Sequence, residues 1–182
     1  MKLRIVAGTH KGRYIVSSSA SADDFRPTSE KVRAAVMSML ATRIADATVL
    51  DLCAGSGAIG FELLSRGAST VCFAENDSKR VMQLVATAAE FDMSEQVRVE
   101  RSDARSFVKN SAASQHYSII YFDPPYNDAA LLALVPEIMH ICADDGILIV
   151  ERASRVQPPY EPGTQSRSYG DTTLDIFYKG TR

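Results

Sequence analysis

The chain has 182 residues, of which 46% are hydrophobic and 23% are charged, and its formal net charge is −2 at pH 7. These values predict one globular domain with a real core and room for a small appendage. No apolar run approaches the roughly 20 residues of a membrane span, the N-terminus lacks the apolar segment of a signal peptide, and the three cysteines, Cys53, Cys72 and Cys142, have no metal-ligand spacing. We therefore expect a cytoplasmic protein with reduced cysteines, no metal site and no membrane contact.

The N-terminal segment is basic. Residues 1–43 carry eight Lys or Arg against three Asp or Glu, whereas the remainder carries 12 against 19. Residues 3–8 and 13–18 flank a short basic turn and predict a β-hairpin, and residues 26–40 predict a helix with Thr28 as its N-cap. The buried stripe of that helix is expected to be Val32, Val36, Met39 and Leu40. We assign residues 1–43 to a basic extension that can face a polyanion, and residues 44–182 to the main domain.

The main domain alternates strand and helix signals. Strands are predicted at residues 48–53, 70–75, 96–101, 117–122 and 146–151, and helices at residues 58–67, 78–91, 103–110 and 128–142. Residues 152–165 are rich in Pro, Gly and polar groups and predict a loop. Residues 166–179 predict two strands around a Gly-Asp turn, which give the sheet an antiparallel C-terminal strand. The alternation predicts a doubly wound, mostly parallel sheet of seven strands that is covered by helices on both faces.

A glycine-rich loop follows the first strand of this sheet. The stretch "LDLCAGSGAIG" places Asp51 before Gly55, Ser56 and Gly57, and formally fits the dinucleotide pattern G-x-G-x-x-G. A carboxylate that points into the loop would repel a pyrophosphate but attract a cationic amino-acid head. S-adenosylmethionine carries an ammonium and a sulfonium, so it fits this loop better than NAD.

Two more acids follow the next two strands. Glu75 ends the second strand, where a carboxylate can accept hydrogen bonds from both hydroxyls of a ribose. Asp103 follows the third strand and can hold the adenine amino group; alternatively it is only an acid at the start of a loop. The neighbouring positions complete the predicted cofactor-binding set, which comprises Asp51, Cys53, Ala54, Gly55, Ser56, Gly57, Glu75, Asn76, Asp103 and Ala104.

The fourth strand ends in the motif Asp123-Pro124-Pro125-Tyr126. An exocyclic amine on a nucleobase is a weak nucleophile, and it becomes reactive when acceptors hold both of its N–H groups. The Asp123 carboxylate and the Pro124 carbonyl can be those acceptors, and the Tyr126 ring can stack on the base. We therefore predict a catalytic motif at residues 123–126 that faces the glycine loop across one crevice. Alternatively, the motif is only a turn that ends the strand, since Asp-Pro and Pro-Pro are common turn dipeptides.

These segments together resemble the bacterial 16S ribosomal RNA guanine-N2 methyltransferases of the RsmD type. The resemblance covers nearly the whole chain and includes "RIVAGTHKGR", "RPTSEKVRAAVMSML", "VLDLCAGSGAIGFELLSRGA", "FDPPY" and "YGDTTLDIFYK". It implies a class I S-adenosylmethionine-dependent methyltransferase with a Rossmann-like fold, whose substrate is 16S rRNA in an assembled or nearly assembled small subunit. It implies no obligate protein partner, and it places on the RNA side Arg4, Lys11, Arg13, Arg26 and Arg33.

Two other functions remain open at this point. A DNA adenine-N6 methyltransferase uses the same DPPY motif, although only about 45 N-terminal residues and a 15-residue loop lie outside the predicted core, which is roughly a hairpin and a helix. An NAD-linked oxidoreductase or a non-catalytic nucleotide-binding module would use the glycine loop alone. The glycine loop and DPPY do not decide among these functions; the N-terminal motifs favour the ribosomal one.

Overall fold

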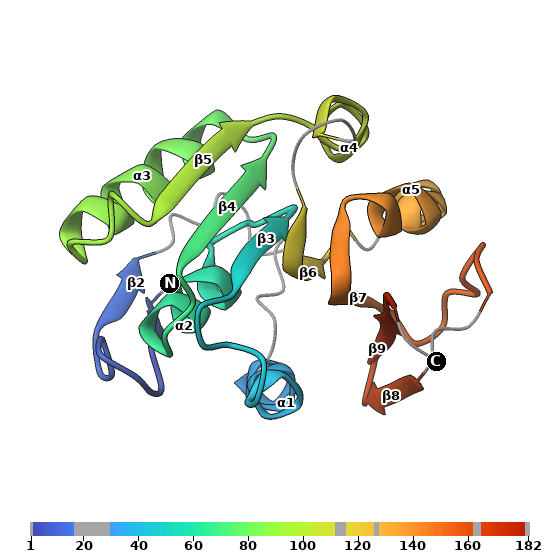
Figure 1. The fold of residues 1–182 in the computed structure, drawn as a ribbon, viewed down its shortest axis with the longest axis horizontal. Helices are drawn as coiled ribbons and strands as arrows, with labels where there is room; N and C mark the ends of the chain where they lie inside the picture. Colours follow the sequence, from blue (N-terminus) through green and yellow to red (C-terminus); the bar gives the residue numbers. More distant parts are fainter. Residues whose placement is uncertain (1, 17–29, 112–115, 126–127, 162–164, 181–182) are drawn as a thin grey trace.

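A seven-stranded sheet forms the centre of the computed structural model, which describes residues 2–16, 30–111, 116–125, 128–161 and 165–180 (Figure 1). The strand order is β5-β4-β3-β6-β7-β9-β8. The bounds of these strands are β3 Thr48–Leu52, β4 Thr70–Glu75, β5 Val97–Arg101, β6 Tyr117–Phe122, β7 Cys142–Ala153, β8 Gln165–Tyr169 and β9 Thr172–Tyr178. The predicted doubly wound, mostly parallel sheet is confirmed.

The direction of the C-terminal strands confirms the predicted antiparallel strand at the C-terminus. Strands β3 to β7 are parallel, and β9 pairs antiparallel with β7. Strand β8 pairs antiparallel with β9, so it runs in the same direction as the parallel strands. Only β9 is therefore antiparallel to the rest, because the tight turn between β8 and β9 must reverse the chain once.

Helices cover both faces of the sheet. They are α1 Glu30–Leu40, α2 Ala58–Ser65, α3 Ser78–Glu90, α4 Ala104–Ser111, the 3-10 helix η1 Ala129–Leu134 and α5 Val135–His140. Alternate strand residues face opposite ways: Val49 and Ile119 pack with α1, α2 and α3, whereas Leu50 and Ile120 pack with α4, η1 and α5. Figure 1 shows α1 and α2 on one side of the sheet and α4 and α5 on the other.

Two predicted element bounds differ from the structure. The helix expected over residues 128–142 is split into η1 and α5, with Pro136 in the first turn of α5. Proline has no N–H to donate to the carbonyl four residues earlier, so an α-helix starts near it and does not run through it. The fifth predicted strand, residues 146–151, extends to Cys142 and Ala153, which shortens the loop that follows it.

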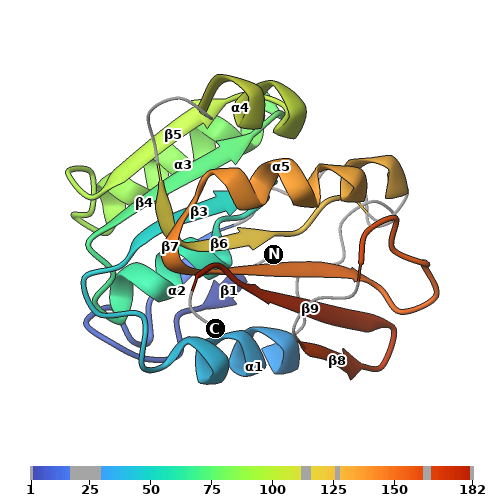
Figure 2. The same cartoon turned by 45° about the vertical axis from the view of Figure 1, so that its right-hand side comes forward.

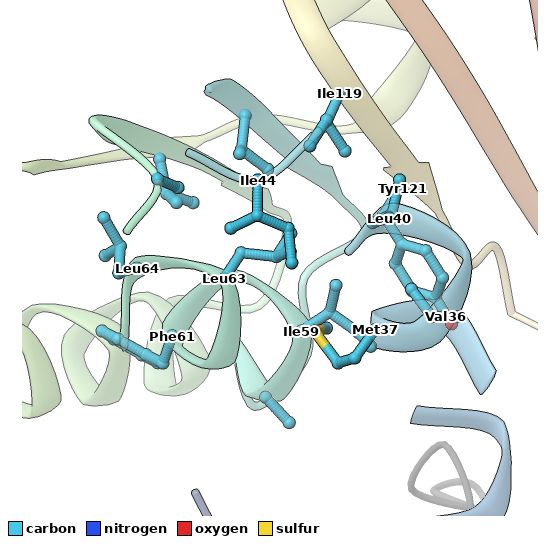
Figure 3. Close-up of a cluster of buried hydrophobic side chains, with 14 of the residues drawn as sticks. Val36, Met37, Leu40, Ile44, Ile59, Phe61, Leu63, Leu64, Ile119 and Tyr121 are labelled. Atoms are coloured by element: carbon cyan, nitrogen blue, oxygen red, sulfur yellow. The ribbon is translucent and has the colours of Figure 1, made fainter. Parts of the chain in front are cut away.

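Helix α1 packs on the sheet through a stripe that is partly the predicted one. Val32, Val36 and Leu40 are buried as expected, but Met37 is buried where Met39 was expected, and Met39 is only partly covered. Figure 3 shows Met37 beside Ile59 of α2. The predicted N-cap, Thr28, lies outside the described residues.

The N-terminal hairpin, β1 Lys2–Arg4 and β2 Tyr14–Val16, is confirmed and docks on α2. The buried Glu62 carboxylate accepts hydrogen bonds from the N–H groups of Val6 at 2.8 Å and Ala7 at 3.1 Å, and it pairs with Arg66 at 2.8 Å. Ile5 and Ile15 are fully buried in the same core as α1 and α2. The hairpin therefore packs as part of the body of the molecule.

Candidate active site

A cleft of about 690 Å³ lies at the carboxyl ends of the parallel strands. Figure 2 shows the tips of β3 and β6 and the β8–β9 turn on the same side of the molecule. The cleft has two halves. The lining of the glycine-loop half includes Asp51, Cys53 to Ser56, Glu75, Asn76 and Ser102 to Arg105. The lining of the β6–β9 half includes Leu3, Asp123 to Pro125, Ala153 to Arg155 and Asp171. The halves meet where β3 pairs with β6, the point at which the strand order reverses.

Asp51 anchors the start of α2 from beneath the glycine loop. Its carboxylate is 2% exposed and accepts a hydrogen bond from the Gly60 N–H at 3.0 Å. Burial raises the pKa of this carboxyl to about 7; the Gly60 hydrogen bond opposes the rise and the nearby Glu75 charge adds to it. A cation beside this buried carboxyl would stabilise its ionised form and lower its pKa.

Glu75 joins the end of β4 to the glycine loop. One carboxylate oxygen accepts the Gly55 N–H at 2.8 Å, and the other accepts the Asp77 N–H at 2.9 Å. A carboxylate has about four lone-pair positions, so two further donors, such as ribose hydroxyls, can still bind. The loop is held in shape by the same acid that was predicted to bind the nucleoside.

The hydrogen bonds of the loop bear on the choice between a dinucleotide and a cationic ligand. A pyrophosphate binds to free backbone N–H groups at a helix N-terminus, but here the N–H groups of Gly55 and Gly60 donate to carboxylates of the chain itself. Burial raises the pKa of the Cys53 thiol, and the carboxylates of Glu75, Asp123, Asp51 and Asp128 raise it further. These four acids line the same cleft as Cys53, and their charge favours a cation over a phosphate there.

The other predicted cofactor residues are placed in different ways. Cys53, Ala54, Gly55, Ser56, Asn76 and Ala104 all line the cleft. Asp103 is an exposed cleft residue whose Oδ1 accepts the Ser106 N–H at 3.0 Å, and this hydrogen bond is the main cause of its lowered pKa. Gly57 is not part of the lining. It has a φ of 73°, and a Cβ at this position would lie 2.5 Å from Cδ2 of Leu84, so its role is to form the turn into α2.

The predicted catalytic motif begins at the junction of the two halves. The Asp123 N–H donates to the Leu52 carbonyl at 3.3 Å, and Asp123, Pro124 and Pro125 line the cleft. The Pro125 carbonyl accepts the Asp128 N–H at 2.8 Å. The Pro124 carbonyl accepts no hydrogen bond from any residue that the structure describes. Tyr126 lies outside the described residues.

Sequence reasoning missed residues in both halves of the cleft, most of them in the β6–β9 half. Residues that line the cleft but were not predicted include Leu3, Arg80, Arg105, Asp128, Ser154, Arg155 and Asp171. Ser154 and Arg155 follow β7 directly, so the rule that ligands bind beyond the carboxyl ends of parallel strands could have indicated them. Leu3 gave no such signal, because its position depends on how the hairpin docks.

The residues predicted to face the RNA differ in their exposure and in their contacts. Arg4 and Lys11 are exposed, whereas Arg13 donates to the Glu90 carbonyl at 2.6 Å and lies 4.6 Å from the centre of the Phe91 ring. Arg33, which was expected on the RNA side, is 5% exposed, and its side chain donates to the Arg4 carbonyl at 3.3 Å. Arg33 is on the stripe of α1 that faces the core, one turn before Met37. Arg26 lies outside the described residues.

Two further findings concern the described part of the chain. None of its helices has the length and apolar character needed to cross a membrane. Within the same residues, no group of three or more His, Cys, Asp or Glu side chains is arranged to hold a metal ion.

Comparisons with known proteins agree with this architecture. The family described as "Conserved hypothetical protein 95" matches residues 3–178. Ribosomal RNA small subunit methyltransferase D of Escherichia coli is 32% identical over 89% of this chain and 77% of the relative. YlbH of Bacillus subtilis is 29% identical over 97% of this chain and 99% of the relative. The solved structure of yhhF from Escherichia coli has a TM-score of 0.82 at 27% identity and covers 100% of both chains. With its class I methyltransferase fold and its strand-end cleft, the chain belongs to the family of ribosomal RNA small subunit methyltransferase D.

Proposed function

We propose that this protein transfers a methyl group from S-adenosylmethionine to the exocyclic N2 amine of one guanine in 16S rRNA, within the small ribosomal subunit or its assembly intermediate in the cytoplasm. One observation carries the proposal: Asp123 and Pro124 line the same cleft as the glycine loop and its acids. A methyl donor and an amine acceptor can therefore meet at the junction of β3 and β6.

The glycine-loop half fits the cofactor by its donor set. The cleft volume lies within the roughly 300–1,000 Å³ of small-molecule sites, and small residues, Ala54 and Gly55, allow close approach of a ligand to the backbone. Asp51 and Glu75 can hold the ammonium group and the ribose hydroxyls, and Asp103 can hold the adenine amine. When bound, the cofactor supplies an electrophilic methyl group on a sulfonium.

The motif at the end of β6 can prepare the acceptor. The Asp123 carboxylate and the Pro124 carbonyl can each accept one N–H of the amine, which directs its lone pair toward the methyl group. As the new N–C bond forms, the amine becomes cationic, and the adjacent carboxylate stabilises that charge and can take the proton. Most of the rate enhancement then comes from positioning and from this fixed charge. A paired guanine must first leave its helix.

The outer face of the N-terminal hairpin is the RNA-binding surface in this proposal. Arg4 pairs across the strands with Tyr14, and Lys2 pairs with Val16. Tyr14 is 49% exposed and Val16 is 55% exposed, beside exposed Lys2, Arg4 and Lys11. A cationic face with an exposed ring suits an unpaired RNA strand, since phosphates bind the cations and bases stack on the ring. The proposal also divides the chain by function into a basic RNA-binding segment, residues 1–43, and a methyltransferase domain, residues 44–182.

Two exposed cations on this surface provide a direct test. The double substitution Arg4→Ala with Lys11→Ala should weaken RNA binding and lower the slope of log affinity against log salt by roughly 0.7 to 0.9 per lost phosphate contact. Lys109→Ala with Arg167→Ala is the matched control, because both residues are exposed outside the hairpin. Filter binding at a series of salt concentrations measures the slope. An unchanged slope in the hairpin variant, or an equal change in the control, contradicts an RNA surface on the hairpin.

The substrate is tested by offering several acceptors to the wild-type protein. Tritiated S-adenosylmethionine is supplied with small subunits from a strain that lacks the gene, with naked 16S rRNA, and with double-stranded DNA. Label in a guanine of 16S rRNA, identified as N2-methylguanine by mass spectrometry, is the expected result. Label in DNA adenine alone would establish the DNA methyltransferase instead. If calorimetric titration detects binding of NAD but not of S-adenosylhomocysteine, both methyltransferase hypotheses fail and the protein is a nucleotide-binding protein instead.

A further inference from the structure

Two turns in the β6–β9 half line the cleft and have no part in the proposed reaction so far. Arg155 lies in a turn closed by a hydrogen bond from the Val156 N–H to the Ala153 carbonyl at 3.0 Å. Asp171 follows Gly170 in the two-residue turn between β8 and β9. Gly170 has a φ of 65°, which suits a hairpin turn with glycine in the first position. Arg155 and Asp171 are both exposed residues of the cleft wall.

The two turns hold each other in place. The Ser154 N–H donates to the Asp171 carbonyl at 2.8 Å, and its hydroxyl donates to the Gly170 carbonyl at 3.0 Å. Behind them, Arg152 donates to the Val156 carbonyl at 2.8 Å and pairs with the buried Asp175 at 2.6 Å. The backbone of both turns is thus fixed to the end of the sheet, as a preorganised binding site requires.

The strand order sets what these turns can reach. Across the cleft, the wall is formed in order by the glycine loop after β3, Asp123 after β6, the Arg155 turn after β7 and Asp171 before β9. Neighbouring strands lie about 4.8 Å apart, so two strand spacings, or about 10 Å, separate Asp123 from Asp171 across the sheet. Phe122 pairs with Val150 and Ala153 pairs with Thr172, so the backbone at Asp171 also lies about three residues, or roughly 10 Å, further along the strand direction. In the proposed function the cofactor occupies the β3 side. A base whose amine lies at Asp123 must therefore extend over the turns after β7 and before β9.

We infer that Arg155 and Asp171 determine base specificity by reading the Watson–Crick edge of the target guanine. This inference rests on the proposed function. Next to its N2 amine, guanine presents the N1–H donor and then the O6 acceptor. A carboxylate can accept from N1–H and a guanidinium can donate to O6, and flipped bases are commonly read through this edge. The pair thus supplies the complementary acceptor and donor.

The same pair rejects bases with the opposite pattern. Adenine presents an unprotonated N1 beside its amine, and a carboxylate facing that lone pair is repelled and left without a donor. Once a bound base covers these two exposed side chains, a polar group left without a partner disfavours the wrong base more strongly than a missing apolar contact does. Arg155 and Asp171 are specificity-determining residues in this scheme, whereas Asp123 and Pro124 act on the amine itself.

The test compares two bases that both carry a 2-amino group. A 16S rRNA is assembled by ligation with either guanine or 2-aminopurine at the methylated position; 2-aminopurine lacks both N1–H and O6. The wild type should prefer guanine in kcat/KM. Asp171→Ala and Arg155→Ala should each lower kcat/KM for guanine by about 10- to 100-fold, and neither should lower it for 2-aminopurine, whose N1 lone pair gains when the Asp171 carboxylate is removed. Asp171→Asn keeps an acceptor oxygen and should recover part of the preference.

Controls separate base recognition from a structural role. Asp144→Ala removes an exposed acid at the start of β7, the opposite end of that strand from Arg155, and should change neither substrate. Equal losses on guanine and 2-aminopurine, with S-adenosylhomocysteine affinity intact, would make Asp171 a structural residue and overturn the inference. A wild type that methylates guanine without discriminating against 2-aminopurine would also overturn it. A wild type that methylates no rRNA guanine at all defeats the proposed function instead.

Discussion

The two halves of the cleft are built in different ways. The glycine-loop half comes from one continuous stretch, β3 to α4, and each of its acids accepts a backbone N–H from within that stretch: Asp51 from Gly60, Glu75 from Gly55 and Asp103 from Ser106. The β6–β9 half is assembled from distant segments, namely Leu3 of the hairpin, the ends of β6 and β7, and the β8–β9 turn. Local sequence therefore shapes one half, and tertiary packing shapes the other.

This difference suggests a division of labour. Rigid, locally specified loops suit a cofactor that is the same for many enzymes, whereas a wall assembled from several segments can be altered to suit one substrate without disturbing the cofactor. The variants below are expected to affect one half and spare the other.

The largest effect is expected from Asp123, at the junction. Asp123→Ala removes an acceptor that acts on the amine, and it should lower kcat by about 10²- to 10³-fold, in the range of other single-group losses of transition-state stabilisation. Affinity for S-adenosylhomocysteine should change little, because Asp123 belongs to the β6–β9 half. Single-turnover rates and calorimetry measure the two quantities.

Asp123→Asn is the matched control, since it keeps the shape but introduces a donor and removes the charge. It should be nearly as inactive as Asp123→Ala if the carboxylate holds the amine and its developing charge. If both variants lose cofactor affinity as much as rate, Asp123 is instead a cofactor ligand, and the two halves do not divide as proposed.

The sequence predicted the glycine-loop half well because its signals are local. Asp51 and Glu75 each end a strand whose apolar run is plain, and glycines directly after such a strand are typical of a turn that a ligand approaches closely. Gly57 was assigned to the ligand, and its positive φ also serves the turn into α2, because such a turn and a ligand contact select the same residue. Nothing in a local window distinguishes the two causes.

The remaining placements depended on long-range contacts. Arg33 reads as one more exposed cation, but it shares a helix face with Val36 and Met37, so docking of α1 buries it. The sequence predicts an RNA contact for Arg13. The backbone carbonyl of Glu90, at the C-terminal end of α3, and the Phe91 ring come within reach of Arg13 only when the hairpin docks. Asp171 could be predicted as part of a turn, but its position beside Ser154 follows from the pairing of β7 with β9.

Docking of the hairpin provides the second test. Gly8 has a φ of 84°, and a Cβ there would lie 1.7 Å from the Ser65 carbonyl oxygen, whereas Gly12 has a φ of 92° and its nearest neighbour would be an Arg4 nitrogen at 3.9 Å. Both alanine variants carry similar backbone strain. Gly8→Ala should therefore lower the free energy of unfolding by about 2–3 kcal/mol more than Gly12→Ala, because it also loses the docking contacts. Urea denaturation measures the difference.

Leu3 of the hairpin lines the β6–β9 half of the cleft and not the glycine-loop half. Gly8→Ala should accordingly reduce RNA methylation while it leaves S-adenosylhomocysteine affinity close to the wild-type value. Equal stabilities for the two glycine variants would mean that the contact with Ser65 contributes little. A large loss of cofactor affinity in Gly8→Ala would mean that the two halves are coupled through α2.

The smallest effect concerns the pH dependence of the glycine-loop half. Burial raises the pKa of Asp51 to about 7 from its ordinary 3.8, so the folded, ligand-free protein holds a proton that the unfolded chain has already lost in this window. The contribution of Asp51 to stability should therefore fall as pH rises from about 4 to 7. A cationic cofactor favours the ionised carboxylate and must expel this proton, so affinity should rise about tenfold between about pH 6 and pH 8.

Two matched variants isolate this titration. Asp51→Asn keeps an oxygen that accepts the Gly60 N–H, and it should flatten the pH profiles of both stability and cofactor affinity. Asp103→Asn should leave both pH dependences in place. Calorimetry in buffers of different ionisation enthalpy measures proton release directly. An absence of release near pH 6 in the wild type would show that Asp51 does not interact with the cationic group, and the ammonium would then have to be held by another acid of the glycine-loop half.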